Sequence, residues 1–258
     1  MESSADWSLV ELAEEPGLWL PPQPGHDVVI GDGFAFVTHG RSAWVHRVRL
    51  DGDGVAPAVE QVRALLRATE LDEVTWWIGE HSTPSDLVPR LEALGLEDDE
   101  PPAMTTLAID APPVAEKSVE VRRVESLDEY LVARQIDWTA FDVPVEEQDE
   151  RRAFARAGWP PLAADGREVL FVAHADGQPV GFGRVVFTPT AGLLLGGATL
   201  PEARGRGVYS ALVLARWREA AARGIPRLVT AAGPMSAPIL RKLGFTQLGS
   251  VQLLRDRL

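Results

Sequence analysis

The chain has 258 residues, contains no cysteine and carries a formal net charge of −13 at pH 7. The lack of cysteine excludes a disulfide framework, a thiol nucleophile and a thiolate metal site, and the negative charge argues against nucleic acid or an anionic membrane as the main partner. No apolar run approaches the roughly 20 residues that a membrane span needs, and the acidic N-terminus does not look like a signal peptide. We therefore expect a cytoplasmic protein, and because the five histidines show no metal-ligand spacing we expect no metal.

The first half of the chain alternates between strand and helix patterns. Short runs of alternating apolar residues predict strands, the dipeptide Asp32-Gly33 predicts a hairpin turn, and apolar residues three and four apart predict helices. In chain order these patterns predict a helical or irregular lead-in, a hairpin, a strand, a helix, a strand and a helix, over residues 1–27, 28–37, 42–50, 59–68, 73–78 and 84–94.

A stretch rich in acidic residues and proline separates the two halves. Residues 97–118 are interpreted as a linker on this composition, although residues 104–109 within them are typical of a strand. We place a domain boundary near Pro112, which divides the chain into residues 1–112 and residues 113–258.

The second half centres on an apolar run that glycines and arginines interrupt before a helical pattern resumes. In chain order the patterns predict a hairpin over 169–187, a strand from 193, a loop over 204–207, a helix ending near 223–224, a strand over 227–230 and a helix that opens at Pro238 and closes at 243–244.

The loop Arg204-Gly-Arg-Gly207 places backbone with little side-chain cover at the start of a helix. Unpaired N–H groups and the positive end of the helix dipole favour an anion there, and the two arginines add charged donors. Residues 201–258 carry ten basic and three acidic side chains, a balance that suits a small polyanion better than a nucleic-acid duplex. The alternative is a surface turn with two solvated arginines.

The order of hairpin, strand, Arg-Gly-Arg-Gly loop, helix, strand, helix and Leu-Gly-Phe resembles the GNAT acetyltransferase superfamily over roughly residues 119–258. The resemblance implies an Arg/Gln-x-x-Gly-x-Gly/Ala loop that binds the pyrophosphate of acetyl-CoA. Arg204 and Gly207 match its first two fixed positions, and Tyr209 stands where a small residue is usual. The implied cofactor-binding residues are Ala198, Thr199, Leu200, Arg204, Gly205, Arg206, Gly207, Val208, Tyr209 and Ser210.

The first half looks like a second, degenerate copy of the same unit. At the position of the phosphate loop it has Asp51-Gly-Asp-Gly54, and two carboxylates there would repel a pyrophosphate. We expect this copy to bind no CoA and to form a wall of the substrate cleft. The expected fold class is therefore α/β (α+β), with two tandem GNAT-like domains, each a mixed, mostly antiparallel sheet flanked by helices. Such copies could pack as an internal pseudo-dimer, so we expect a monomer or a weak homodimer.

Acetyl transfer to an amine needs a base that takes a proton and can use an acid that protonates the leaving thiolate. The resemblance implies that this acid is a tyrosine four residues before Gly-Phe, but Leu240 occupies that position here, and Gly233 replaces an asparagine often found seven residues earlier. Ser236 is the nearest hydroxyl. It either bonds the sulfur or caps the helix that opens at Pro238.

Candidate bases lie in the segment where the resemblance places a substrate-facing helix and loop. The candidates are Asp142, Glu146 and Glu147, and the alternative for each is a solvated surface acid. Two neighbouring aromatic residues, Trp138 and Phe141, either line an apolar pocket or belong to the core.

The resemblance implies an N-acetyltransferase that moves an acetyl group from acetyl-CoA directly to the amine of a small molecule. The acidic bulk of the chain suits a cationic amine. Two alternatives remain open. One is a catalytically silent acyl-CoA-binding or scaffold protein, and the other is an antibiotic-resistance or biosynthetic acyltransferase that uses another acyl-CoA or an O-nucleophile.

Overall fold

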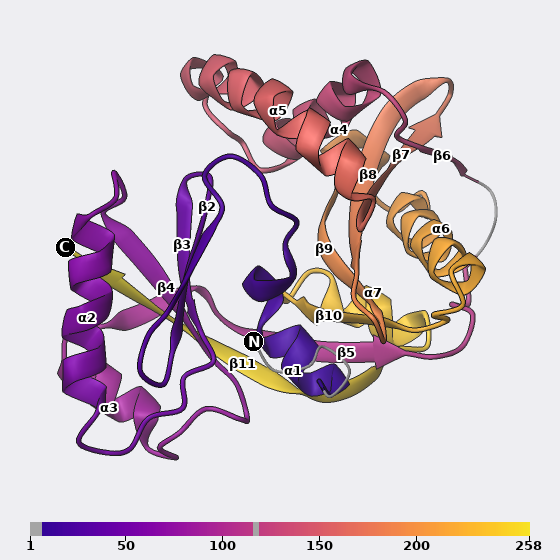
Figure 1. Ribbon diagram of the computed structural model, residues 1–258. Helices are drawn as coiled ribbons and strands as arrows, with labels where there is room; N and C mark the ends of the chain where they lie inside the picture. The colour runs from indigo at the N-terminus through magenta and orange to yellow at the C-terminus, as the bar shows by residue number, and fades with distance from the viewer. Residues whose placement is uncertain (1–6, 116–118) are drawn as a thin grey trace.

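The computed structural model describes residues 7–115 and 119–258, and within them eleven strands form one sheet (Figure 1). The strands, in the order in which they lie side by side, are β1 (Asp27–Ile30), β2 (Ala35–His39), β3 (Ser42–His46), β4 (Glu73–Ile78), β11 (Thr246–Arg257), β5 (Glu97–Ile109), β10 (Leu228–Ala232), β9 (Gly192–Thr199), β8 (Gln178–Phe187), β7 (Glu168–Ala175) and β6 (Glu120–Arg123). The helices are α1 (Leu9–Glu14), α2 (Val55–Arg67), α3 (Leu87–Ala93), α4 (Leu127–Ala140), α5 (Val145–Asp165), α6 (Val208–Ala222) and α7 (Ala237–Lys242), with short 3₁₀ turns at Pro16–Trp19 and Pro201–Ala203.

The expected mixed, mostly antiparallel sheet is confirmed. The pairs β3–β4 and β9–β10 are parallel, and the other neighbouring strands run antiparallel. Each parallel pair follows a hairpin, encloses a helix and precedes a further helix and a long strand, so the two halves of the chain repeat one order of elements. No helix in the described ranges combines the length and the apolar character that a membrane crossing requires.

The long strand of each half crosses to the other half. β11 pairs with β4 along one side and with β5 along the other, while β5 also pairs with β10. In Figure 1, β5 and β11 run side by side from the first half, at the left, to the second half, at the right. The ion pair between Arg63 of α2 and the buried Asp256 of β11, at 2.8 Å, ties the chain end to the first half. Strands from both sides of Pro112 in the sequence therefore belong to one continuous sheet. The domain boundary proposed near Pro112 stays a prediction.

The interpretation of residues 97–102 as a linker is wrong, because they form the first part of β5. One of their acidic side chains, Asp99, has a basic partner on β11. The Asp99 carboxylate accepts hydrogen bonds from Arg255 and from the Thr75 hydroxyl, which lies 2.9 Å away. Burial alone would raise the pKa of Asp99, but these hydrogen bonds hold it below its usual value. An acidic run can be a strand when the neighbouring strand supplies the opposite charge.

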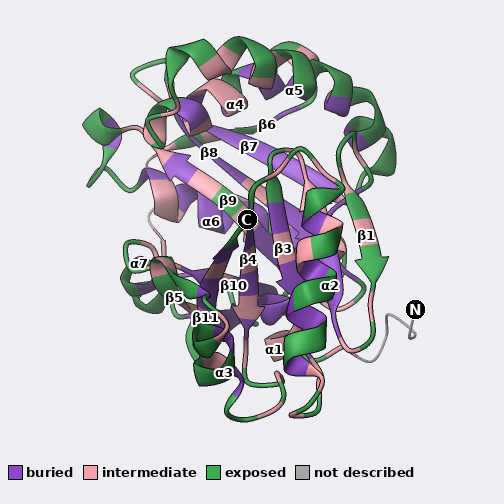
Figure 2. Ribbon diagram, turned by 90° about the vertical axis from the view of Figure 1, so that its left-hand side faces the viewer, coloured by how far each residue is buried: buried purple, intermediate pink, exposed green. Residues whose placement is uncertain are grey.

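Helices cover the sheet on both sides of the second half. α4 and α5 pack on one face through a cluster that includes Tyr130, Leu162 and Phe182, while α6 packs on the opposite face through Val208 and Leu212. In the first half, α2 and α3 cover one face. Figure 2 shows the central strands mostly buried and the outer sides of α2, α3 and α5 exposed. These layers leave the end of β9 and the start of α6 accessible.

The lead-in predicted over residues 1–27 is helical in part: residues 1–6 lie outside the described structure, and Leu9–Glu14 and Pro16–Trp19 are helical. α1 begins with a capping box in which Ser8 and Glu11 bond each other's backbone N–H groups. Its residue Leu12 packs among residues of β9 and β10. Two buried carboxylates then extend into the first half: Glu14 accepts the N–H of residue 80, and Glu15 accepts the N–H of residue 47, both at 2.7 Å. α1 therefore contacts both halves.

Candidate functional site

The parallel strands β9 and β10 pair only at their first residues and then part. Their register covers Gly192 with Leu228 and Leu193 with Val229, after which the Thr230 hydroxyl donates to the Leu194 carbonyl at 2.9 Å. A bulge in β9 at residue 196, with a φ of +67°, turns the strand further away. The result is an opening between two strands that are adjacent in the sheet.

Backbone groups of β9 point into this opening. The N–H of Leu200 donates to the Val180 carbonyl of β8 at 2.9 Å. Because backbone polar groups alternate in direction along a strand, the N–H and C=O groups of Thr199 and Gly197 face the other way. The Thr199 hydroxyl is buried and has no hydrogen-bond partner in the described structure. An extended polar ligand could satisfy these groups.

A glycine-rich loop leads from β9 to α6. Gly205 and Gly207 adopt φ angles of +74° and +76°, the left-handed region in which glycine is favoured. A Cβ atom at either position would meet no atom within 4 Å, so the backbone conformation and not lack of space favours glycine there. α6 is 15 residues long and begins at Val208. The N–H groups of its first turn have no acceptor within the helix and are available to an anion.

A cavity of about 490 Å³ joins this helix start to the strand opening. Its lining comes from β9, the loop, the start of α6, the region of α7 and the end of α4. The predicted cofactor residues that line it are Ala198, Thr199, Arg204, Gly205, Gly207, Val208, Tyr209 and Ser210.

Two predicted cofactor residues do not line this cavity. Leu200 directs its N–H to β8, and Arg206 directs its guanidinium to Asp176 in the β7–β8 turn, with 2.8 Å between Nη2 and Oδ2. Both side chains of that ion pair are exposed. The roles predicted for Leu200 and Arg206 stay predictions.

The candidate catalytic residues are placed differently from one another. Ser236 lines the cavity, and its hydroxyl donates to the Gly233 carbonyl at 3.4 Å without making a capping bond to α7. Asp142 and Glu146 are exposed and lie outside the lining, on the turn after α4 and in the first turn of α5. Glu147 bonds Arg151 within α5. None of these placements assigns a catalytic role, so all remain predictions.

The two aromatic residues near the candidate bases differ in burial. Phe141 lines the cavity with 61% of its surface exposed, whereas Trp138 is 1% exposed and belongs to the core. Leu240, at the position where the resemblance implies a tyrosine, is also a core residue.

Apart from Ser236, the α7 side of the cavity is not among the predicted site residues. Met235, Ile239 and Lys242 line it, and their spacing of four and three residues is the signal that could have placed them on one helix face. Together with Phe141, the first two form an exposed apolar rim. The charged lining residues are Arg204 and Lys242, so the cavity suits an anionic ligand.

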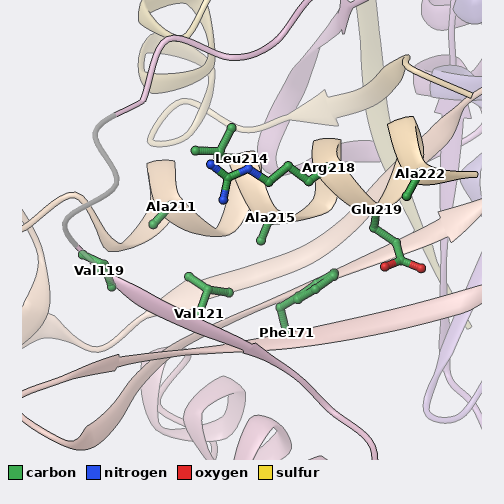
Figure 3. Close-up of a pocket in the computed structure, with 9 residues that line it drawn as sticks. All are labelled: Val119, Val121, Phe171, Ala211, Leu214, Ala215, Arg218, Glu219 and Ala222. Atoms are coloured by element: carbon green, nitrogen blue, oxygen red, sulfur yellow. The ribbon is translucent and has the colours of Figure 1, made fainter.

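A second hollow of about 330 Å³ lies between α6 and strands β6 and β7 (Figure 3). Most of its lining residues are Val, Ala, Leu or Phe, with Phe171 facing the helix. The carboxylate of Glu219 is already bonded by Arg123 and Arg223. The lining residues of this hollow show no arrangement of polar groups that indicates a catalytic or binding site.

Comparisons with known proteins point to one family and one fold. Residues 130–245 match the sequence model described as the acetyltransferase (GNAT) family. No curated protein matches the sequence.

Three solved structures share the fold over most of the chain. A GCN5-related N-acetyltransferase from Kribbella flavida is 16% identical, with a TM-score of 0.66 and coverage of 90% of both chains. A conserved protein of unknown function from Staphylococcus epidermidis is 12% identical, with a TM-score of 0.65 and coverage of 90% of this chain and 94% of that one. A tandem GNAT protein from the clavulanic acid biosynthesis pathway is 18% identical, with a TM-score of 0.62 and coverage of 93% and 86%.

Proposed function

Residues 130–245 belong to the GNAT acetyltransferase family, and from that premise we propose that this chain moves an acetyl group from acetyl-CoA directly to the amine of a small molecule. A tandem GNAT protein shares the fold over 93% of this chain. The cavity that joins the start of α6 to the opening between β9 and β10 is the observation that carries the proposal.

The residues of this cavity fit the two chemically distinct parts of acetyl-CoA. The N–H groups at the start of α6 and the guanidinium of Arg204 would hold the phosphates. The backbone of Gly197 and Thr199 would pair with the amide groups of the pantetheine arm, and the buried, unpartnered Thr199 hydroxyl supports a polar ligand there. When bound, acetyl-CoA supplies a thioester whose acyl carbon accepts an amine nitrogen.

The acceptor would approach the inner end of the cavity from the side of Phe141. The exposed carboxylates of Asp142 and Glu146 follow this residue in the chain, and either could take a proton from a cationic amine. The net charge of −13 supports an amine that carries positive charge before it reacts. No residue of the first half lines the cavity in the described structure. That the first half forms a wall of the substrate cleft remains a proposal.

A second candidate function is that of a silent acyl-CoA-binding or scaffold protein. The observation in its favour is that Leu240 is buried in the core where the resemblance implies a proton donor. An acyltransferase that uses a longer acyl-CoA or a hydroxyl acceptor is the third candidate, since the rim formed by Phe141, Met235 and Ile239 could contact apolar groups.

Calorimetry with acetyl-CoA tests the binding step. The intact chain should bind one acetyl-CoA, and Arg204→Ala should weaken binding about tenfold, because it removes a charge-assisted hydrogen bond. Arg206→Ala is the matched control: it removes the same charge from the same loop, but the Arg206 guanidinium is engaged by Asp176, so it should weaken binding less. Absence of binding by the intact chain would overturn the proposed function.

Thiol release separates the candidates. A panel of small amines assayed with acetyl-CoA should include at least one that gives steady-state release of CoA. Binding of acetyl-CoA without release on any amine or alcohol would favour the silent protein. Faster release from longer acyl-CoA donors would favour the third candidate. Sedimentation at several concentrations would test the expectation of a monomer or weak homodimer.

A further inference from the structure

The bulge in β9 leaves three residues without partners in the register of β8 and β9. The register passes from the pair of residues 183 and 197 to the pair of residues 185 and 194, so Arg184 of β8 stands opposite both Leu195 and Gly196 of β9. One residue that faces two is the pattern of a β-bulge, which interrupts the ladder of hydrogen bonds and turns the strand. Buried backbone groups at such a point need donors from elsewhere.

The side chain of Arg184 bonds the bulged strand directly. Its Nε donates to the carbonyl of Leu195 at 2.7 Å. Its Nη1 lies 3.5 Å from Oε1 of Glu168, whose side chain is 1% exposed. A Cβ atom at Gly196, which has a φ of +67°, would lie 3.4 Å from the Arg184 Nε. The guanidinium is therefore held between a carbonyl of the bulge and a buried carboxylate, and it lies against the glycine of the bulge.

A second guanidinium bonds the residue opposite the bulge. Arg216 of α6 is 1% exposed, and its Nη1 donates to the carbonyl of Arg184 at 3.2 Å, while its Nε donates to the carbonyl of residue 212 at 3.0 Å. No described carboxylate forms an ion pair with Arg216. A buried charge without an ionic partner is costly. This cost favours a role for Arg216 in the site over a role in stability alone.

The two guanidinium groups approach the bulge from opposite faces of the sheet. Side chains alternate between the faces along a strand. Phe182, two residues before Arg184, belongs to the cluster beneath α4, whereas Arg216 comes from α6 on the other face. Gly183 leaves the space for Arg216, since a Cβ atom there would lie 2.9 Å from the Arg216 Cζ. The bulge is therefore fixed from both sides, through one carbonyl of each strand.

The bulge sets which backbone groups of β9 face the cavity. Gly197, Ala198 and Thr199 follow it in the chain and line the cavity. Because backbone direction alternates with a period of two, a shift of one residue in the register with β8 would turn the N–H and C=O groups of Gly197 and Thr199 away from the opening. The geometry of the cavity at this strand therefore depends on the bulge.

We propose that Arg184 and Arg216 are positioning residues of the cofactor site: together they hold the bulge of β9, and through it the backbone of Gly197 and Thr199 that would pair with the pantetheine arm of acetyl-CoA. This inference rests on the proposed function. Neither arginine lines the cavity, so both act through the strand and not by touching the cofactor.

Calorimetry with two ligands tests the inference on the full chain. Acetyl-CoA would contact both the loop before α6 and the strand opening, whereas adenosine 5′-diphosphate 3′-phosphate, the nucleotide of CoA without its pantetheine arm, would contact only the loop. Arg184→Met and Arg216→Met should each weaken acetyl-CoA binding about threefold to tenfold, because hydrogen bonds to the arm lose their alignment. Both variants should bind the nucleotide as the unaltered chain does. Equal losses for the two ligands, or no loss for acetyl-CoA, would overturn the inference.

Arg223→Met is the matched control. Arg223, at the end of α6, also donates to a backbone carbonyl, that of Gly166 at 3.1 Å, but it does not line the cavity. This variant should change neither affinity. Arg184→Lys and Arg216→Lys keep a charged donor and should recover part of the acetyl-CoA affinity, which a role in packing alone does not predict. If a Met variant fails to fold, the Lys variants carry the comparison of the two ligands.

A second pair of variants disturbs the bulge and keeps both arginines. Gly196→Ala places a Cβ atom in the left-handed region against Arg184, so it should weaken acetyl-CoA binding and spare the nucleotide. Gly224→Ala introduces the same strain at the other end of α6, where φ is +76°, and should change neither affinity. An unchanged acetyl-CoA affinity of Gly196→Ala would contradict the inference.

A double substitution tests whether the two arginines act on one feature. Arg184→Met/Arg216→Met should weaken acetyl-CoA binding by less than the product of the two single losses, since both residues hold the same bulge. Losses that multiply in full would show two independent effects and would overturn the shared role. If the unaltered chain binds no acetyl-CoA, the proposed function is overturned, and this inference with it. If it binds acetyl-CoA and the variants affect both ligands alike, only this inference fails.

Discussion

At the scale of single residues, burial holds several titratable groups of the first half away from the charge states they would have in water. Burial lowers the pKa of His39 and of His46 to about 3. His46 is fully buried, and its Nε2 accepts the N–H of Gly17 at 3.3 Å, which requires a neutral ring. Glu15 shows the opposite shift: burial raises its pKa to about 7 although it accepts the N–H of Arg47.

The two histidines predict a loss of stability in acid. Their folded pKa values of about 3 lie below the ordinary 6.5, so the unfolded chain binds more protons between these values, and stability falls as the pH falls from 6.5 towards 3. Each histidine should cost about 2 kcal/mol at pH 5 relative to pH 7. Urea unfolding at the two pH values measures the effect. His39→Gln should reduce this dependence, and an unchanged dependence would contradict the assignment.

Glu15 predicts a change of opposite sign. Its folded pKa of about 7 lies above the ordinary 4.5, so its contribution is complete below pH 4.5 and is lost as the pH rises through 7. Glu15→Gln, which stays uncharged, should therefore be more stable relative to the unaltered chain at pH 8 than at pH 4.5. Thermal unfolding across this range checks the prediction. A constant difference between the two proteins would count against a raised Glu15 pKa.

At the scale of elements, charge partners and backbone angles decide how strands pair and where the loop of residues 204–207 turns. Asp99 on β5 has a side chain that is 14% exposed and depends on Arg255 of β11. The ends of α6 are both marked by glycines at a φ of +76°, Gly207 before the helix and Gly224 after it. The Asp99 ion pair and the two glycines can each be tested by comparing a substitution with a matched control.

Loss of the cross-strand partner should destabilise the sheet. Arg255→Ala leaves the Asp99 carboxylate largely buried without its main partner, and we expect a loss of about 1 to 3 kcal/mol. Arg257→Ala is the control: this arginine is 60% exposed and pairs with the exposed Glu73, so the loss should stay below about 1 kcal/mol. If both variants lose the same free energy of unfolding in urea, the pair of Asp99 and Arg255 contributes no more to stability than the exposed pair.

The two glycines of α6 separate backbone strain from ligand binding. Gly207→Ala and Gly224→Ala should each cost about 1 to 2 kcal/mol, because both place a Cβ atom in the left-handed region without a clash. Only Gly207→Ala should also weaken acetyl-CoA binding, since Gly207 lines the cavity. Calorimetry on both variants gives the comparison, and equal affinities would argue against binding at this loop.

At the scale of the whole molecule, exchange of the long strands makes the two halves depend on each other. β5 lies between β10 and β11, and β11 lies between β4 and β5. Each half therefore contributes the neighbour that the other half's parallel strand requires. The α1 helix adds a further connection, because it packs on β9 and β10 while Glu14 and Glu15 bond the first half.

This exchange predicts one cooperative unfolding transition for the intact chain. Circular dichroism and tryptophan fluorescence should give coincident urea transitions. A fragment of residues 113–258 lacks β5, so β10 and β11 lose their common neighbour, and we expect it not to fold. A cooperative transition in that fragment would contradict this expectation and would support an independent domain beginning after Pro112.

Local chemistry made much of the fold predictable from the sequence alone. The turns at Asp32-Gly33 and Asp176-Gly177, the strands that follow them, and the loop of Gly205 and Gly207 depend on backbone preferences of neighbouring residues. Helix α5 is not among the predicted elements, since it contains Pro160 and Pro161 before its end at Asp165 and its apolar residues form no clear stripe. Most of the residues that line the main cavity near β9 and α6 had been named from the loop.

Only the tertiary structure decided what depends on contacts between distant segments. The acidic start of β5 is a strand because Arg255, more than 150 residues later, lies beside Asp99. The opening of β9 and β10, the pairing of Arg206 with Asp176 and the hydrogen bond from Arg216 to the carbonyl of residue 184 have the same origin. The sequence alone determined the local elements and the glycine-rich loop before α6, because neighbouring residues set backbone conformation. The tertiary structure decided strand partners and the shape of the cavity, because these depend on side chains that only folding brings together.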